Sequence, residues 1–127
     1  MKNAPSLPKD VEDKILEITS LNLTINQLLD LYGESFGDTA LGQSNIQAAL
    51  ENFKSRQGEL RKAICNTSFI KTIIDDKHAN KATSLMAITI AEHLLKNNFC
   101  TINIAAMAVI LAQYGLERFC KNGIEIC

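Results

Sequence analysis

The chain has 127 residues, of which 46% are hydrophobic and 21% are charged. This length predicts one domain around one core, and this composition excludes both a disordered tail and a membrane protein. The formal charge is -1, so the chain lacks the overall basic excess expected of a protein that coats nucleic acid without sequence preference.

The first predicted helix covers residues 9–19. Val11, Ile15 and Ile18 are spaced by four and three residues, which places them on one helix face. Residues 1–8, which precede this pattern, are expected to be disordered. The chain is predicted to form a single helical domain over residues 1–127.

A second helix is predicted over residues 25–32. Thr24 and Gln27 have the spacing of a capping box, in which the hydroxyl accepts from a backbone N–H and the glutamine side chain reaches back. Gly33 can adopt the left-handed conformation that ends a helix. The glycines that follow predict a flexible loop over residues 33–43.

A third helix is predicted after Ser44, which repeats the capping pattern. Its apolar residues recur at threes, fours and sevens: Ile46, Ala49, Leu50, Phe53, Leu60 and Ile64. Gly58 in its interior costs about 1 kcal/mol relative to alanine. Residues 66–68 offer caps for a short fourth helix with four large apolar residues: Phe69, Ile70, Ile73 and Ile74.

Residues 82–116 are predicted to form the core, because Glu92 and Lys96 are the only formal charges among them. The fifth helix, over residues 82–96, is expected to be enclosed on both sides. The sixth begins near Thr101 or Asn103 and runs to about Lys121. We interpret 82–121 as an antiparallel core hairpin. Its longest apolar stretch, about eleven residues, is shorter than the roughly 20 needed to cross a bilayer.

The predicted fold class is therefore all-α, a single compact bundle of about five to six helices with a central apolar C-terminal helical hairpin. No segment shows the sustained alternation of apolar and polar residues, rich in β-branched side chains, that marks a strand. No internal repeat or low-complexity run is present.

The four cysteines are expected to be free thiols in a cytoplasmic protein. No apolar export region follows residues 1–10, and a chain this apolar needs no disulfides. Cys65, Cys100 and Cys120 fall beside predicted helix ends or apolar stripes, where a thiol packs as a small hydrophobe. The spacing of Cys120 and Cys127 matches no zinc-binding pattern, so no metal site is predicted.

Charge is distributed unevenly along the chain. Residues 1–53 contain eight acids and three bases, and residues 54–127 contain six acids and ten bases. A basic strip lies on the third helix: Lys54, Arg56, Arg61 and Lys62. Three explanations remain open: self-complementarity within the fold, a solvated helix face, or a surface for an acidic partner or nucleic acid.

Glu92 is unusual because it lies in a very apolar helix, where a charge must be paired, protonated or exposed. Lys96, four residues on, is its local partner in the simplest interpretation. A ligand pocket between the fifth and sixth helices, lined by Glu92, His93 and Cys100, is the alternative. Cys100 near a helix N-terminus and a nearby histidine also resemble, without specificity, a cysteine nucleophile and its base.

No catalytic motif, phosphate-binding loop or cofactor motif is present, so no catalytic residue and no cofactor are predicted. Whether the protein is an enzyme stays open, and the residues favour a noncatalytic helical interaction or regulatory module that self-associates or binds a protein partner. One alternative is a small enzyme or ligand-binding protein that uses the pocket. Another is a weak nucleic-acid binder through the basic strip, which we consider less favoured. No membrane partner is expected, and the identity of any small ligand is unknown.

Overall fold

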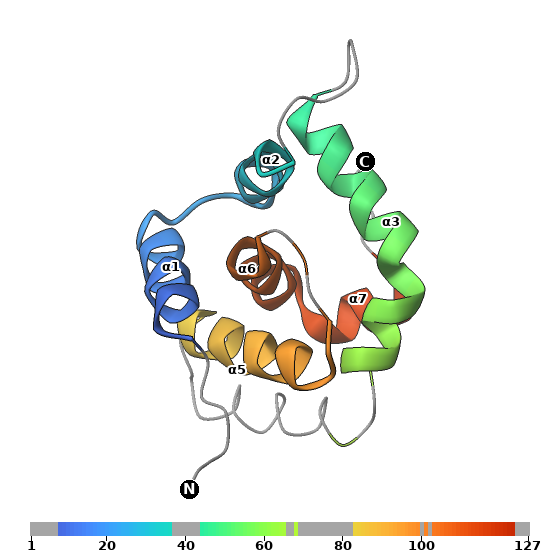
Figure 1. Ribbon diagram of the computed structural model, residues 1–127. Coiled ribbons are helices and arrows are strands. Elements are labelled where there is room, and N and C mark those ends of the chain that lie inside the picture. Colours follow the sequence, from blue (N-terminus) through green and yellow to red (C-terminus); the bar gives the residue numbers. More distant parts are fainter. Residues whose placement is uncertain are drawn as a thin grey trace, which may run out of the picture.

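The computed structural model describes residues 8–36, 44–65, 68, 83–99, 101 and 103–123. The fold is all-α, as predicted, and the described residues form six helices packed in a compact arrangement (Figure 1). These are α1 (Lys9–Ser20), α2 (Ile25–Glu34), α3 (Asn45–Ile64), α5 (Thr83–Lys96), α6 (Ile104–Tyr114) and α7 (Leu116–Asn122).

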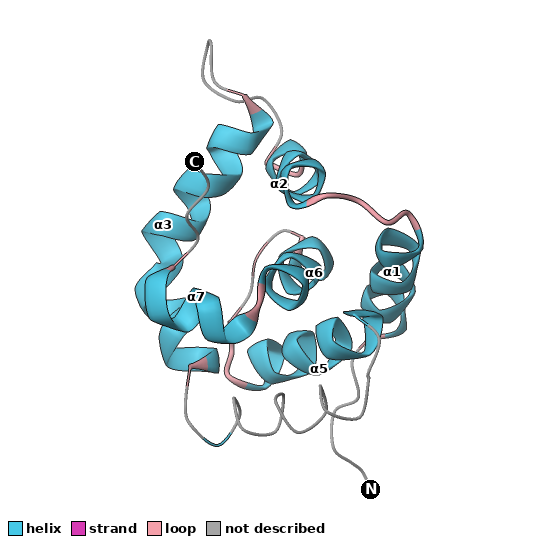
Figure 2. Cartoon of the chain, turned by 180° about the vertical axis from the view of Figure 1, so that it is seen from behind, coloured by secondary structure: helices cyan, strands magenta, loops and turns pink. Residues whose placement is uncertain are grey.

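Helix α6 occupies the centre, and the other helices surround it (Figures 1 and 2). Every residue of α6 except Gln113 is buried. The helix can be surrounded in this way because its residues are almost all apolar. The side chain of Asn103 caps the helix by accepting from the backbone N–H of Ala106 at 3.1 Å. Gln113 donates its amide to the carbonyl oxygen of Leu23 at 2.8 Å, which ties α6 to the α1–α2 turn.

Helices α5 and α6 pack against each other, as expected for the apolar core, but their arrangement differs from the prediction. In Figures 1 and 2, α5 is seen side-on and α6 nearly end-on, so the two helices cross rather than run antiparallel. Only one side of α5 is fully buried, through Ala87, Ile90, Ala91 and Leu94. Leu85 is 48% exposed, so the expectation that α5 is enclosed on both sides was wrong.

The predicted continuous sixth helix to Lys121 was also wrong, because the chain turns at Gly115. This glycine has a φ of 110°, a conformation that L side chains rarely adopt. A separate helix, α7, follows directly. Gly115 therefore ends α6.

The predicted capping box of α2 is confirmed. Thr24 accepts from the backbone N–H of Gln27 at 3.1 Å, and the glutamine Oε1 accepts from the backbone N–H of Thr24 at 2.8 Å. Gly33, however, does not end the helix, which continues to Glu34. It is buried where α2 meets the start of α3, and a Cβ there would lie 2.5 Å from the carbonyl carbon of Asn45. Close packing, not turn formation, explains this glycine.

Helix α3 begins as predicted, with the Ser44 hydroxyl accepting from the backbone N–H of Gln47 at 3.1 Å. It continues unbroken through Gly58. The predicted disordered segment, except for Pro8, lies outside the described residues. So do most of the predicted 33–43 loop and, apart from Ser68, the predicted fourth helix. No helix in the described ranges has the length and apolar character needed to cross a membrane.

Candidate functional site

A cluster of polar side chains joins α2, α3 and the loop before α6. The Tyr32 hydroxyl donates to Asn52 Oδ1 at 2.7 Å and lies 2.7 Å from Thr101 Oγ1. Burial raises the pKa of Tyr32, an effect that the Thr101 hydrogen bond and the Arg56 charge partly oppose. The three side chains satisfy one another, so the cluster fastens the loop to the two helices.

Arg56 belongs to the same region and is engaged within the fold. Its guanidinium lies 4.1 Å from the centroid of the Phe99 ring, which is a cation–π contact. It also donates to both carboxylate oxygens of Glu59, at 3.1 and 3.2 Å. This hydrogen bonding lowers the pKa of Glu59. Arg56 therefore helps to hold the loop that carries Phe99 against α3.

The four residues of the basic strip therefore differ in their exposure to solvent. Lys54 and Lys62 are exposed, whereas Arg61 is half-buried, and among the described residues its buried Nε has no hydrogen-bond partner. The ion pair of the strip in the described ranges, Arg56 with Glu59, lies within α3 itself. Helices α1 and α3 lie on opposite sides of α6 (Figure 1), so α1 cannot neutralise the outward-facing lysines.

A shallow hollow of about 250 Å³ lies between the C-terminal half of α3 and the loop after α5. Its lining combines one acid, one base, two amides and an aromatic ring: Glu59, Lys62, Ala63, Asn97, Asn98 and Phe99. The sequence did not indicate that the residues of this loop line a hollow, because the hollow forms only where α3 packs beside the loop. The predicted strip residue Lys62 does reach the hollow.

Two of the three predicted pocket residues, Glu92 and His93, lie in the described part of α5 and differ in burial. Glu92 is exposed on the outer side of α5, and within the described residues it forms no ion pair with Lys96, so solvent replaces the predicted partner. His93 is half-buried and is hydrogen-bonded to the backbone of Ala63, which also lines the hollow. Burial lowers the pKa of His93, the Ala63 hydrogen bond opposes this shift, and the Lys96 charge adds to it. Cys100 lies outside the described residues.

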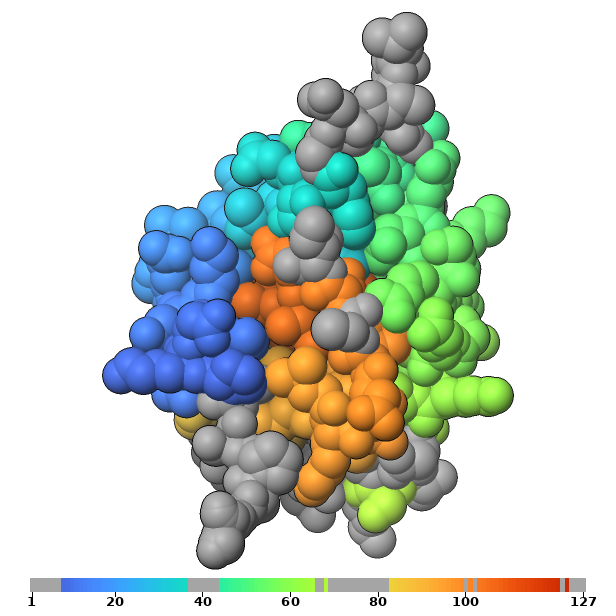
Figure 3. Space-filling view, viewed as in Figure 1, coloured from blue at the N-terminus to red at the C-terminus, as the bar shows by residue number. Residues whose placement is uncertain are grey.

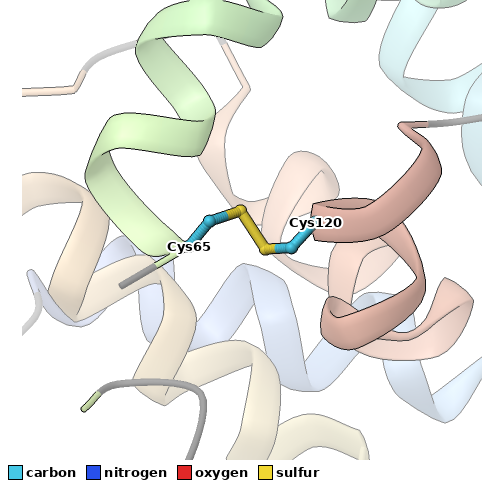
Figure 4. Close-up of a disulfide and its surroundings, with 2 residues drawn as sticks. All are labelled: Cys65 and Cys120. Carbon is cyan, nitrogen blue, oxygen red and sulfur yellow. A yellow bond between two sulfur atoms is a disulfide. The ribbon is translucent and has the colours of Figure 1, made fainter. Parts of the chain in front are cut away.

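The expectation of free thiols was wrong for two of the cysteines. Cys65, at the end of α3, and Cys120, in α7, form a disulfide with a Cα–Cα distance of 5.6 Å (Figure 4). The two cysteines are 55 positions apart in the sequence, and no local pattern signalled their pairing. The turn at Gly115 directs α7 towards α3 and so brings the two sulfurs together. Among the described residues, no group of three or more His, Cys, Asp or Glu could hold a metal ion.

On the face seen in Figure 3, the side chains of α1, α2, α3 and α5 close around the orange segment that leads into α6. The candidate site is therefore the surface beside α3, with the hollow and the two exposed lysines.

No family model, no curated protein and no solved structure matches this chain.

Proposed function

We propose that the protein is a noncatalytic helical interaction module that binds a protein partner or a second copy of itself. The observation that carries this proposal is that three leucines remain exposed: Leu16 at 43%, Leu21 at 59% and Leu85 at 48%. Leu16 belongs to α1, Leu21 directly follows it, and Leu85 lies in the first turn of α5, which packs against α1. A partner that covers them gains about 25 cal/mol for each Å² of apolar surface removed from water.

The use of the polar side chains supports the same function. Tyr32, Asn52 and Thr101 satisfy one another, and Asn103 donates to the Ser35 hydroxyl at 2.8 Å. Groups engaged in this way hold elements together rather than face a substrate. A general acid or base would instead need access to a reacting group within hydrogen-bond distance.

Sedimentation velocity over a wide range of protein concentration tests self-association. The double variant Leu16→Gln and Leu85→Gln should shift the chain towards monomer, because it removes the apolar surface without altering the core. Glu17→Gln with Thr83→Gln is the matched control, since both residues are exposed on the same two helices. The proposal is contradicted if the chain is always monomeric and a photo-crosslinking side chain at position 85 captures no protein.

A second candidate, binding of a small ligand, is favoured by the hollow beside α3. The acid and base in its lining and the Phe99 ring suit a small polar molecule with an apolar part. Ligand screening by thermal shift tests this candidate, and Lys62→Ala should abolish any shift. Nucleic-acid binding through Lys54 and Lys62 is less favoured, and binding that does not weaken with added salt would exclude it. The compartment we propose is the cytoplasm, which cell fractionation tests.

A further inference from the structure

Helix α7 is a short element that follows α6 directly after a glycine turn. It has seven residues, Leu116–Asn122, and an isolated helix of that length is not stable in water. Gly115 connects it directly to α6 in a conformation with positive φ. The position of α7 must therefore come from its contacts with the rest of the molecule.

Among the described residues, α7 is held by two buried side chains, a cation–π contact of Arg118 with the Tyr114 ring, and one side-chain hydrogen bond. The Phe119 ring packs against Phe53 of α3 with their centroids 6.4 Å apart, and Leu116 is buried. The Tyr114 hydroxyl donates to the carbonyl oxygen of Gly123 at 3.0 Å. Ordering seven residues costs more conformational entropy than burying two large apolar side chains returns. The covalent link between Cys65 and Cys120 makes up this difference.

The disulfide lies at the edge of the core rather than inside it. Both cysteines are partly buried, and they join the first residue after α3 to α7 (Figure 4). The loop that the bond closes includes α5 and α6, but α6 is packed by several helices and does not depend on the bond in the way α7 does. Breaking the bond should therefore affect α7 before the core.

We propose that Cys65–Cys120 is a thiol–disulfide exchange site that acts as a latch: oxidation holds α7 on α3, and reduction by a thiol of the glutathione or dithiol class releases it. A reductant thiolate attacks one sulfur and forms a mixed disulfide, and the other protein sulfur leaves as a thiolate. A second reductant thiolate then attacks the reductant sulfur of the mixed disulfide, and the remaining protein sulfur leaves as a thiolate. The protein gains two electrons and two protons, and the reductant leaves as its own disulfide.

Release of α7 has a structural consequence that follows from its contacts. Phe119 and Phe53 are 1% and 2% exposed in the latched form. Moving α7 about Gly115 uncovers the aromatic surface that they share. A reversible bond also fits a reducing compartment, where disulfides are transient and serve redox sensing.

The test is amide hydrogen exchange of the full chain, first oxidised and then equilibrated with dithiothreitol. Mass spectrometry after alkylation confirms that two further thiols have formed. We expect exchange in residues 116–122 to rise on the order of tenfold or more, whereas residues 104–112 keep their protection. The double variant Cys65→Ser with Cys120→Ser should match the reduced protein without reductant and should not respond to it.

Cys100→Ser with Cys127→Ser is the control, and this variant should respond to reductant like the natural chain. Three results would overturn the latch. In the first, residues 116–122 stay protected after both thiols have formed. In the second, protection is lost throughout the core, which would show that the bond stabilises the whole fold rather than α7 alone. In the third, the bond resists dithiothreitol in the native state.

Discussion

Two glycines in helix interiors show how one residue type serves opposite purposes. Gly33 allows α2 to approach the backbone of Asn45, where a Cβ has no room. Gly58 is exposed in α3, and nothing lies within 4 Å of the position that its Cβ would take. Helix propensity alone would favour alanine at both positions by about 1 kcal/mol.

The variant Gly33→Ala should therefore lower the free energy of unfolding by about 1–3 kcal/mol, because the α2 and α3 backbones must move apart. Gly58→Ala should raise it by about 0.5–1 kcal/mol, since only propensity changes. Urea unfolding of both variants beside the natural chain provides the measurement. A stabilised Gly33→Ala variant would disprove the close approach.

Local signals in the sequence predicted what local interactions decide. Thr24 with Gln27, and Ser44 with Gln47, are capping pairs that interact within one turn. The first forms the full predicted box, and in the second the Ser44 hydroxyl accepts from the backbone N–H of Gln47. The role of Gly33 and the pairing of Cys65 depend on residues in other elements, and no pattern near either residue reports them. The hollow is of the same kind, because α3 and the loop after α5 form it together.

At the scale of the elements, α6 and α5 differ in burial more than their similar apolar composition indicates. The apolar stretch correctly predicted the position of the core, but periodicity could not tell which of the two helices would be surrounded. Leu111 in α6 is 0% exposed, whereas Leu85 in α5 is 48% exposed. Only the arrangement of the other helices around α6 separates them.

The same truncation should therefore have very different effects in the two helices. Leu111→Ala should cost about 2–5 kcal/mol of stability, because it leaves a cavity in the centre of the bundle. Leu85→Ala should cost less than about 1 kcal/mol, since water already contacts that side chain. Thermal and chemical unfolding measure both changes. Equal losses would show that α6 is not the enclosed element.

For the whole molecule, the uneven charge of the sequence becomes a separation in space. Helix α1, whose exposed acids include Glu12 and Glu17, lies across the bundle from α3, which carries the exposed Lys54 and Lys62 (Figure 1). Self-complementarity, the simplest of the three interpretations of the strip, is thus limited in the described residues to the Arg56–Glu59 pair. The lysines stay available to solvent or to a partner.

The pH dependence of unfolding is set in part by His93, which links α5 to Ala63 of α3. Its pKa in the folded protein is below the ordinary 6.5. Between these two pKa values, His93 is therefore protonated in the unfolded chain and neutral in the folded chain. Stability should therefore fall as the pH drops through 6.5 towards the lower, folded pKa, and be insensitive to this group at higher pH. His93→Gln should flatten the curve measured by urea unfolding between neutral and mildly acidic pH. Replacing His78, the other histidine, is the control, and an unchanged curve in the His93 variant would contradict the assignment.

The central position of α6 also bears on synthesis of the chain. A ribosome makes α1 and α2 before α6, yet both helices pack against α6. Until residues 104–114 emerge, the nascent chain carries the apolar faces of these two helices without their common partner, the condition under which chaperones bind. Completion of the bundle therefore waits for one eleven-residue segment that is translated after both of them.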